Sequence, residues 1–291
     1  MSIQTIGVIG AGQMGSGIAQ VLAAAGFDVT VTDVNPDALN TATARISANF
    51  EKQVARGKIT EEDKRAAEGR IETCTALSDI GHCGLVIEAA TEKEAVKQKM
   101  FDDLIPHLNP EAILTSNTSS LSITRLAGRT PCPERFMGLH FMNPVPVMQL
   151  IELIRGIATS DETLAAVRAV VDRLGKTPVM ASDFPAFIVN RVLIPMINEA
   201  VFVLHEGVGS IVDIDNSMKL GANHPMGPLE LADFIGLDTC LSIMQVLNEG
   251  LADPKYRPCP LLVKYVEAGW FGRKVGRGFY DYHSEPAVPT R

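Results

Sequence analysis

The chain has 291 residues, of which 46% are hydrophobic and 21% are charged, and its formal net charge at pH 7 is −8. This composition is that of an ordinary globular protein long enough for two domains. The negative charge argues against nucleic acid or an anionic membrane as the main partner. The five cysteines are scattered without a C-x-x-C pair, so they predict neither a metal site nor a disulfide framework. Because a strand is predicted almost from the first residue, we expect no signal peptide and a cytoplasmic protein.

The first predicted strand, at residues 6–9, ends in a glycine-rich turn that opens a helical pattern reaching about residue 25. The first glycine permits a tight turn, the second lets the backbone approach a pyrophosphate, and the third lets helix and strand pack closely. Unpaired N–H groups at the start of the helix would face the phosphates. The predicted cofactor-binding residues of this turn are Gly10, Ala11, Gly12, Gln13, Met14 and Gly15.

Asp33 ends the second apolar run, at residues 29–32, and lies eighteen residues after the last of these glycines. A carboxylate there can accept hydrogen bonds from both ribose hydroxyls of NAD and repels the additional phosphate of NADP. The next three residues offer no arginine for such a phosphate, so the pattern favours NAD. The alternative is that Asp33 caps the helix predicted to begin near Pro36, a role for which Asn35 competes.

Helices and strands alternate over the next part of the chain. Two helices at about 36–56 and 60–68 are larger together than a crossover between strands requires, so we predict a helical hairpin that projects from the sheet. Further strands are predicted at residues 85–88, 113–116, 136–141, 149–154 and 177–180, with helices at about 92–108 and 161–174. This alternation predicts an α/β fold with a Rossmann-type, doubly wound and mostly parallel sheet.

A break at residues 183–185 separates this region from an almost wholly helical one. Helices are predicted at about 187–206, 210–219, 229–234, 238–251 and 260–268, and residues 284–291 are predicted to be an unstructured tail. We therefore predict a nucleotide-binding domain at 1–184 and a smaller all-helical domain at 185–291. The apolar stretch at 187–204 is too polar for a membrane span, because it contains Asn190, Arg191, Asn198 and Glu199.

Two neighbouring strands carry an imidazole and a carboxylate. His140 precedes a Pro-rich turn at 143–146, and Glu152 lies in the apolar run that follows the turn. A charged glutamate is costly to bury unless it is paired, so a turn that brings the strands together would make His140 its partner. The other ring nitrogen could then act on a substrate as a general acid or base. The residues alone leave a purely structural His–Glu pair as an equal alternative.

Six sequence blocks are spread over nearly the whole chain: GAGQMGSGIAQ at 10–20, SNTSSL at 116–121, GLHFMNPVP at 138–146, DFPAFIVNRVLIPMINEA at 183–200, HPMGPLELADFIGLD at 224–238 and GRKVGRGFYDY at 272–282. As a set they resemble the 3-hydroxyacyl-CoA dehydrogenase family, and most of all its short bacterial 3-hydroxybutyryl-CoA dehydrogenases. The resemblance implies interconversion of (S)-3-hydroxyacyl-CoA and 3-ketoacyl-CoA by hydride transfer to or from NAD.

The resemblance also implies roles for individual residues. His140 would exchange the proton of the 3-hydroxyl group, while Glu152 would orient the imidazole and favour its cationic form. Ser119 and Asn190 would hydrogen-bond the reacting oxygens of the acyl group. Family matches extend the cofactor-binding set to Glu92, Lys97, Ser119, Asn143 and Lys274. Two of these residues have other interpretations, since Ser119 could cap a helix near Ser122 and Lys274 could be a surface charge.

The projecting hairpin could bind coenzyme A. Lys52 and Arg56 lie one turn apart on the same helical face, and the resemblance implies that they hold the phosphates of coenzyme A. A merely solvated face is the alternative. His224 is predicted to be a structural loop residue. The apolar helices of the second domain exceed what a small domain needs to bury, so we also predict a homodimer.

Three other functions were weighed against this one. An NAD-dependent dehydrogenase of a free hydroxy or sugar acid would share His140 and Glu152 but would not need Lys52 and Arg56. A β-hydroxyacid dehydrogenase is less favoured, because that family relies on a lysine base in a glycine-rich motif that is missing from this sequence. A non-enzymatic NAD-binding protein could use the same fold without the chemistry, and the set Ser119, His140, Glu152 and Asn190 argues against it.

Overall fold

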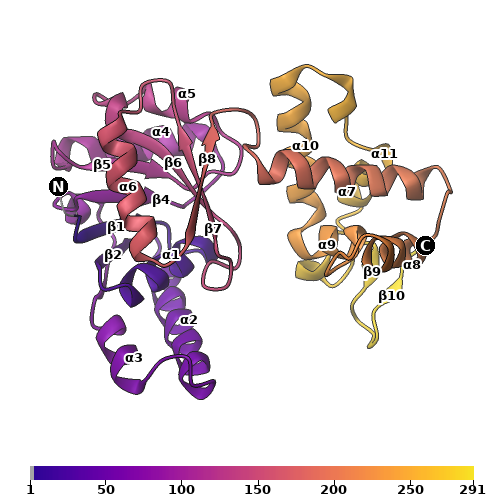
Figure 1. The fold of residues 1–291 in the computed structure, drawn as a ribbon, viewed down its shortest axis with the longest axis horizontal. Coiled ribbons are helices and arrows are strands. Elements are labelled where there is room, and N and C mark those ends of the chain that lie inside the picture. Colours follow the sequence, from indigo (N-terminus) through magenta and orange to yellow (C-terminus); the bar gives the residue numbers. More distant parts are fainter. Residues whose placement is uncertain (1–2) are drawn as a thin grey trace. The chain divides into compact units, whose positions relative to one another are not determined.

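The computed structural model describes residues 3–291. The chain divides into two compact units, Met1–Phe184 and Pro185–Arg291 (Figure 1). Within the described residues, no helix combines the length and the apolar character that a membrane crossing requires.

The first unit is built on an eight-stranded sheet with the strand order β3-β2-β1-β4-β5-β6-β7-β8. The strands are β1 (Thr5–Ile9), β2 (Asp28–Thr32), β3 (Ile71–Cys74), β4 (Leu85–Glu88), β5 (Ile113–Ser116), β6 (Phe136–Phe141), β7 (Leu150–Arg155) and β8 (Thr177–Ser182). All neighbouring pairs are parallel except β6 and β7, which are antiparallel. The order of the first six strands is that of dinucleotide-binding sheets, in which ligands bind where the winding reverses, here between β1 and β4.

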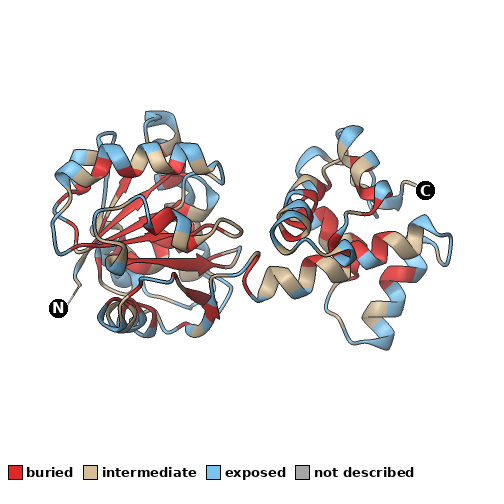
Figure 2. Cartoon of the chain, turned by 90° about the horizontal axis from the view of Figure 1, so that it is seen from above, coloured by how far each residue is buried: buried red, intermediate tan, exposed pale blue. Residues whose placement is uncertain are grey.

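Helices cover both faces of this sheet. They are α1 (Gln13–Ala24), α2 (Pro36–Ala55), α3 (Glu61–Glu68), α4 (Glu94–Leu104), α5 (Ile123–Ala127) and α6 (Asp161–Arg173), with 3₁₀ turns at Leu77–Ile80, Ile105–His107 and Pro133–Arg135. Because both faces are covered, the central strands read as continuous apolar runs rather than alternating ones. Every residue of β4, β5 and β6 is buried, as the red strands of Figure 2 show.

The hairpin of α2 and α3 extends from one end of the sheet (Figure 1). Asn35 begins α2, because its side chain accepts a hydrogen bond from the Asp37 N–H at 3.0 Å. Thr60 begins α3 through a capping box with Asp63. One face of α2 is anchored in the core by apolar side chains such as Ile46 and Phe50, while its far end is solvent-exposed.

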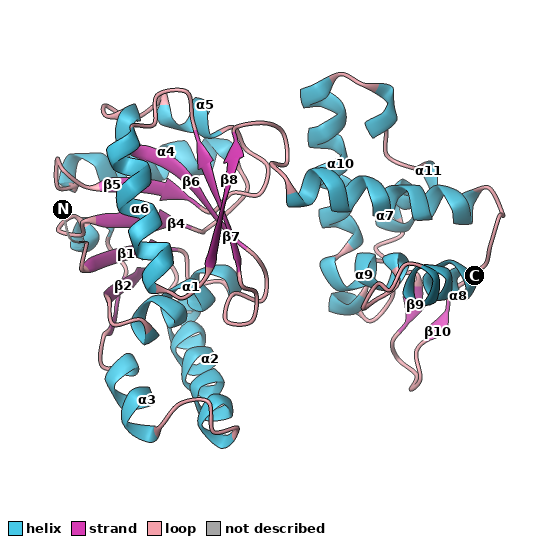
Figure 3. Cartoon of the chain, in the orientation of Figure 1, coloured by secondary structure: helices cyan, strands magenta, loops and turns pink. Residues whose placement is uncertain are grey.

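The second unit is almost entirely helical (Figure 3). Its helices are α7 (Val189–His205), α8 (Ile211–Asn216), α9 (Pro228–Ile235), α10 (Leu237–Leu251) and α11 (Pro260–Glu267), with a π-helical turn at Ser217–Gly221 and 3₁₀ turns at Pro254–Tyr256 and Arg273–Val275. The inward faces of these helices form a separate apolar core around residues such as Ile197, Leu237 and Met244. This unit therefore has its own hydrophobic interior.

The expectation of an unstructured tail at 284–291 is wrong. Strands β9 (Tyr280–Asp281) and β10 (Val288–Pro289) pair as an antiparallel hairpin. The Thr290 hydroxyl also lies 2.9 Å from the carbonyl oxygens of Gly278 and Phe279. The polar composition of the segment did not reveal this pairing, because its partner strand lies in the preceding sequence block.

Two buried aspartates attach this C-terminal segment to the helices. Asp233 accepts hydrogen bonds from the N–H groups of Phe279 and Tyr280, both at 2.8 Å, and from the Tyr282 hydroxyl at 3.0 Å. Asp215 accepts one from the Tyr280 hydroxyl at 2.7 Å. Burial raises the pKa of Asp233 to about 6, although these donors oppose the shift. Part of the GRKVGRGFYDY block therefore serves to attach the C-terminal segment to the helices.

Candidate active site

His140 and Glu152 face each other across the antiparallel pair β6–β7. Their Cα positions are directly opposed in the register, so both side chains project from the same face of the sheet. The Nδ1 atom of His140 lies 2.7 Å from Oε2 of Glu152. Glu152 is 0% exposed and His140 is 7% exposed. The carboxylate thus holds the imidazole by Nδ1, and Nε2 is the ring nitrogen directed away from Glu152.

The turn between these strands is anchored by a buried lysine. The ammonium group of Lys176 donates to the carbonyl oxygens of Val145 at 2.9 Å and Met148 at 2.6 Å. Burial lowers the pKa of Lys176. Two backbone acceptors held by one ammonium group fix the path of the turn, and with it the side chain of Asn143.

Asn143 brings the turn to the glycine-rich motif. Its Oδ1 atom accepts a hydrogen bond from Nε2 of Gln13 at 3.0 Å. A Cβ atom on Gly17 would lie 2.9 Å from Cβ of Val145, so α1 and the turn are in close contact. A cavity of about 290 Å³ opens beside this contact. Its lining includes Gln13, Ser16, Arg45, Asn49, Asn143 and Pro146.

The geometry of the glycine-rich turn suits a dinucleotide pyrophosphate. Gly10 has φ +103°, and a Cβ atom there would lie 2.6 Å from Cα of Ala90. A Cβ atom on Gly15 would lie 1.8 Å from the carbonyl oxygen of Gly10. Gly12 is exposed with open space around it, and none of the described side chains caps the start of α1. The first N–H groups of α1 therefore face an unobstructed surface that can accept an anion.

Asp33 lies beside this turn at the end of β2. Its Oδ2 atom accepts from the N–H of Ala11 at 2.8 Å, and Oδ1 accepts from the N–H of Asn35 at 2.9 Å. Each carboxylate oxygen retains a second lone pair, which suits the ribose hydroxyls of NAD. The helix-capping alternative for Asp33 is not observed, because the side chain of Asn35 caps α2.

Glu92 holds the segment after β5. Its Oε1 atom accepts from the N–H of Ser119 at 2.7 Å and from the Ser119 hydroxyl at 2.9 Å. Its Oε2 atom accepts from the Thr118 hydroxyl at 2.6 Å. The alternative of Ser119 as a helix cap is not observed either, since Ser122 caps α5. Ser119 is half-buried and is positioned by Glu92, a residue that the family resemblance predicted to bind the cofactor.

Lys97 lies in α4 and is fully buried. Its ammonium group forms an ion pair with Glu88 and donates to the Ser116 hydroxyl at 3.3 Å. The side chain is almost completely buried in this structure.

The remaining predicted residues lie on the hairpin or in the second unit. Lys52 is exposed in the last turn of α2, and Arg56 follows as the exposed C-cap residue. Asn190 is half-buried in the first turn of α7. Lys274 contacts both carboxylate oxygens of Asp238 at 2.6 Å.

Several residues near the site were missed by sequence reasoning. Arg45 donates to the Ser16 hydroxyl at 3.0 Å, and Asn49 donates to Oε1 of Gln20 at 3.2 Å. The sequence could have indicated both residues, because the polar positions 45, 49, 52 and 56 are spaced by three or four residues and therefore lie on one face of α2. The contact of Glu88 with Ser116 and that of Lys176 with Val145 carried no comparable signal, since the partners lie 28 and 31 residues apart in the sequence.

The strand order, the open helix N-terminus and the carboxylate at the end of β2 define an NAD-binding protein of the doubly wound class. The profile described as "3-hydroxyacyl-CoA dehydrogenase, NAD binding domain" matches residues 5–184, and the profile of the C-terminal domain matches residues 187–282. The chain belongs to the 3-hydroxyacyl-CoA dehydrogenase family and is an NAD-dependent oxidoreductase.

Relatives match over almost the full length. The 3-hydroxybutyryl-CoA dehydrogenase of Bradyrhizobium diazoefficiens is 63% identical over 289 residues, which cover 99% of each chain. The probable 3-hydroxybutyryl-CoA dehydrogenase of Bacillus subtilis is 55% identical, over 98% of this chain and 99% of its own. The crystal structure of (S)-3-hydroxybutyryl-CoA dehydrogenase from Ralstonia eutropha matches with a TM-score of 0.94 and 49% identity, over 97% of this chain and 99% of that chain.

Proposed function

We propose that the protein interconverts (S)-3-hydroxybutyryl-CoA and acetoacetyl-CoA with NAD. The observation that carries this proposal is the direct opposition of His140 and Glu152 across β6 and β7, with 2.7 Å between Nδ1 and Oε2. The relatives that match over nearly the whole chain support the choice of a four-carbon acyl group.

His140 is the proposed general base and acid. NAD, when bound, supplies the hydride acceptor at carbon 3. In the direction of oxidation, Nε2 of His140 takes the proton of the 3-hydroxyl group, and in reduction it returns that proton to the ketone oxygen. Glu152 holds the ring through Nδ1 and stabilises the imidazolium that forms. Ser119 and Asn190 are proposed to hydrogen-bond the reacting oxygens of the acyl group.

The proposed NAD site combines the glycine-rich turn with Asp33, which would bind the adenosine ribose. Glu92 and Asn143 adjoin this site through Ser119 and Gln13, respectively. Lys97 and Lys274 complete the proposed set on the strength of the family resemblance.

A direct assay tests the proposed activity. The absorbance of NADH should fall when acetoacetyl-CoA is added to the purified protein, and a C4 to C16 series of acyl-CoA substrates would define the chain-length preference. A folded protein that binds NADH but turns over acetoacetyl-CoA at no pH would instead support a non-enzymatic NAD-binding role.

Coenzyme A is proposed to lie along one face of α2. Arg45 and Asn49 line the cavity beside Asn143, and Lys52 and Arg56 continue the same face. Eleven residues of helix span about 16 Å, so this face connects the cavity to the exposed cations at the end of α2. The acyl end would then lie near the cavity and the phosphates near the cations.

Replacing both Lys52 and Arg56 by alanine should raise KM for acetoacetyl-CoA about tenfold, because charge-assisted contacts with phosphate are lost. The kcat and the KM for NADH should not change. The control Arg65→Ala/Arg70→Ala removes two positive charges from the other end of the hairpin, where both side chains donate to backbone carbonyls. Unchanged KM in the first variant would favour a free hydroxy acid as substrate.

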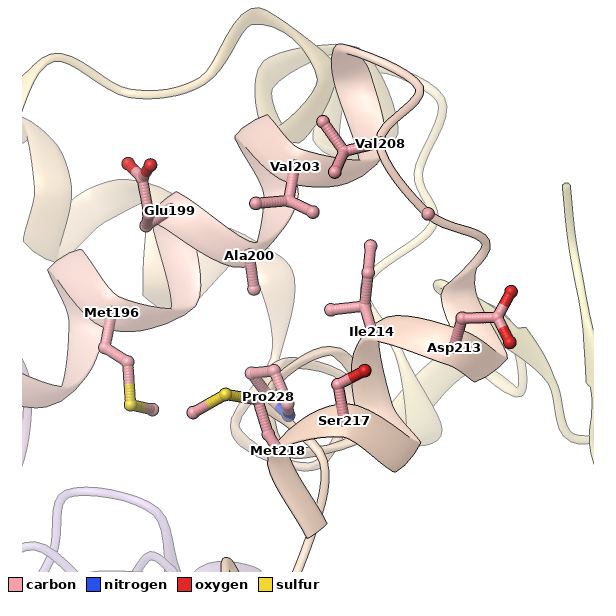
Figure 4. Close-up of a pocket in the computed structure, with 11 residues that line it drawn as sticks. Met196, Glu199, Ala200, Val203, Val208, Asp213, Ile214, Ser217, Met218 and Pro228 are labelled. Atoms are coloured by element: carbon pink, nitrogen blue, oxygen red, sulfur yellow. The ribbon is translucent and has the colours of Figure 1, made fainter. Parts of the chain in front are cut away.

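The second unit is proposed to form a homodimer. Val192, Val208 and Leu220 of this unit are large apolar side chains that are 69%, 74% and 85% exposed. An apolar groove of about 450 Å³ lies in the same unit between α7 and α8 (Figure 4). Its lining includes Met196, Ala200, Val203, Val208, Ile214 and Met218.

Light scattering at micromolar concentration should give twice the chain mass of 31.3 kDa. Replacing both Val208 and Leu220 by glutamate should shift the protein to a monomer, because charges are costly to bury at an interface. Ile157→Glu is the control, since Ile157 is 90% exposed in the first unit. A monomeric wild-type protein would disprove the dimer.

We also propose that the enzyme works in the cytoplasm, where thiols such as those of its five cysteines stay reduced.

A further inference from the structure

Ser119 lies in the segment 118–122, which connects β5 with α5 and belongs to neither a helix nor a strand. We call these residues the Ser119 loop. The Thr118 hydroxyl accepts hydrogen bonds from the N–H groups of Ser120 at 3.3 Å and Leu121 at 3.0 Å, so the loop is closed into a turn. Because the turn is outside the ladder of the sheet, its position depends on the groups that hold its two ends.

The beginning of the loop is held by Glu92. Its Oε2 atom accepts from the Thr118 hydroxyl at 2.6 Å. Its Oε1 atom accepts from the N–H of Ser119 at 2.7 Å and from the Ser119 hydroxyl at 2.9 Å. This carboxylate therefore contacts Ser119 directly.

The end of the loop is held by Asp183. Its Oδ2 atom accepts from the Ser122 hydroxyl at 2.9 Å and from the N–H of Thr124 at 2.7 Å. Its Oδ1 atom accepts from the N–H of Ile123 at 2.9 Å. The first N–H groups of a helix have no acceptor within the helix. The Asp183 carboxylate thus fixes where α5 begins, and with it where the Ser119 loop ends.

Asp183 is distant from this loop in the sequence. It follows β8 directly and lies 60 residues after Ile123. Ile123 is 0% exposed, so water is a poor substitute for the carboxylate as the acceptor of its N–H. Arg125 of α5 also pairs with Glu94, but the Arg125 side chain is 58% exposed, and exposed pairs contribute little. In the sequence, Asp183 indicated only the boundary between the two units.

We infer that Asp183 is a positioning residue for Ser119. Together with Glu92 at the other end, its carboxylate fixes the Ser119 loop and so places the Ser119 hydroxyl for its contact with the reacting oxygen. The inference rests on the dehydrogenase function proposed above, which gives Ser119 that contact. A hydroxyl stabilises a reacting oxygen only within a narrow range of distances, so a displaced loop should slow turnover more than it weakens binding.

Substitution of Asp183 tests the inference. Asp183→Ala removes all three contacts and should lower kcat for acetoacetyl-CoA about tenfold, with its KM and the NADH affinity within about twofold of wild type. Asp183→Asn keeps an acceptor for Ile123 and can donate to the Ser122 hydroxyl, so its kcat should stay within about threefold of wild type. Asp172→Ala, in the exposed last turn of α6, is the matched control and should have no effect. Unchanged kcat in Asp183→Ala would overturn the inference.

A double-mutant cycle with Ser119→Ala distinguishes positioning of Ser119 from general support of the fold. Once the Ser119 hydroxyl is absent, Asp183→Ala should cost less than about a further twofold in kcat. A carboxylate that only supports the fold would cost the same factor in both backgrounds, and that result would contradict the inference. If Asp183→Ala does not fold, Ser122→Ala takes its place in the cycle with an expected loss of about threefold. Equal losses in the two backgrounds would again be contradictory.

Hydrogen exchange tests the position of the loop without any substrate. The N–H of Ser119 donates to Glu92, and its exchange should be about tenfold faster in Asp183→Ala than in wild type. Unchanged exchange at this N–H would disprove the inference even if turnover fell. A wild-type protein that does not turn over acetoacetyl-CoA would instead disprove the proposed function, and the exchange rates would still show whether Asp183 holds the loop.

Discussion

His140→Ala should lower kcat for both oxidation and reduction by at least about a hundredfold, because a positioned general acid–base group contributes roughly 10² to 10⁴ in rate. The substitution removes the imidazole nitrogen that exchanges the substrate proton, and alanine cannot replace it. NADH affinity should change little, since the glycine-rich turn and Asp33 are untouched. Steady-state kinetics with acetoacetyl-CoA and fluorescence titration with NADH would measure both quantities.

The control for this substitution is an exposed histidine of the same unit. His107 lies in the 3₁₀ turn after α4, and its replacement by alanine should leave kcat unchanged. Circular dichroism should show that His140→Ala remains folded, because Glu152 loses its imidazole partner in a fully buried position. Retention of more than about a tenth of wild-type activity would show that another group exchanges the proton.

Glu152→Gln should reduce kcat by at least about tenfold, with NADH affinity unchanged. Glutamine has nearly the same shape, so the packing of β7 is preserved. Its amide cannot stabilise an imidazolium as a carboxylate does, and an amide N–H directed at Nδ1 selects the tautomer with the proton on Nε2. That tautomer cannot accept the proton of the 3-hydroxyl group, so oxidation of 3-hydroxybutyryl-CoA should suffer more than binding.

Measuring both kcat and NADH affinity distinguishes a catalytic role of Glu152 from a structural one. Glu162→Gln, in the exposed first turn of α6, is the matched control and should have no effect. Equal losses of NADH affinity and turnover in Glu152→Gln would mean that Glu152 only stabilises the fold. A loss confined to kcat supports its assignment to the imidazole.

The strands at the centre of the sheet were predictable because they are buried on both faces and therefore consist largely of apolar runs. The apolar runs at 85–88, 113–116 and 136–141 coincide with β4, β5 and β6. Strand β3 was missed, because it includes the exposed Glu72 and Thr73 and has no apolar run. The five-residue helix α5 was too short for a periodic signal.

The sequence by itself determined the dinucleotide turn, the carboxylate after β2 and the change from alternating to helical elements, because each depends on neighbouring residues and on the conformations they allow. Only the tertiary structure decided which polar groups share a buried position. Glu152 is opposite His140 because of the register of two strands, and Lys97 is held by Glu88 and Ser116 because the first turn of α4 meets the ends of β4 and β5. A buried charge requires a partner of opposite sign or a set of donors, and the identity of that partner depends on packing between segments that the linear sequence does not place together.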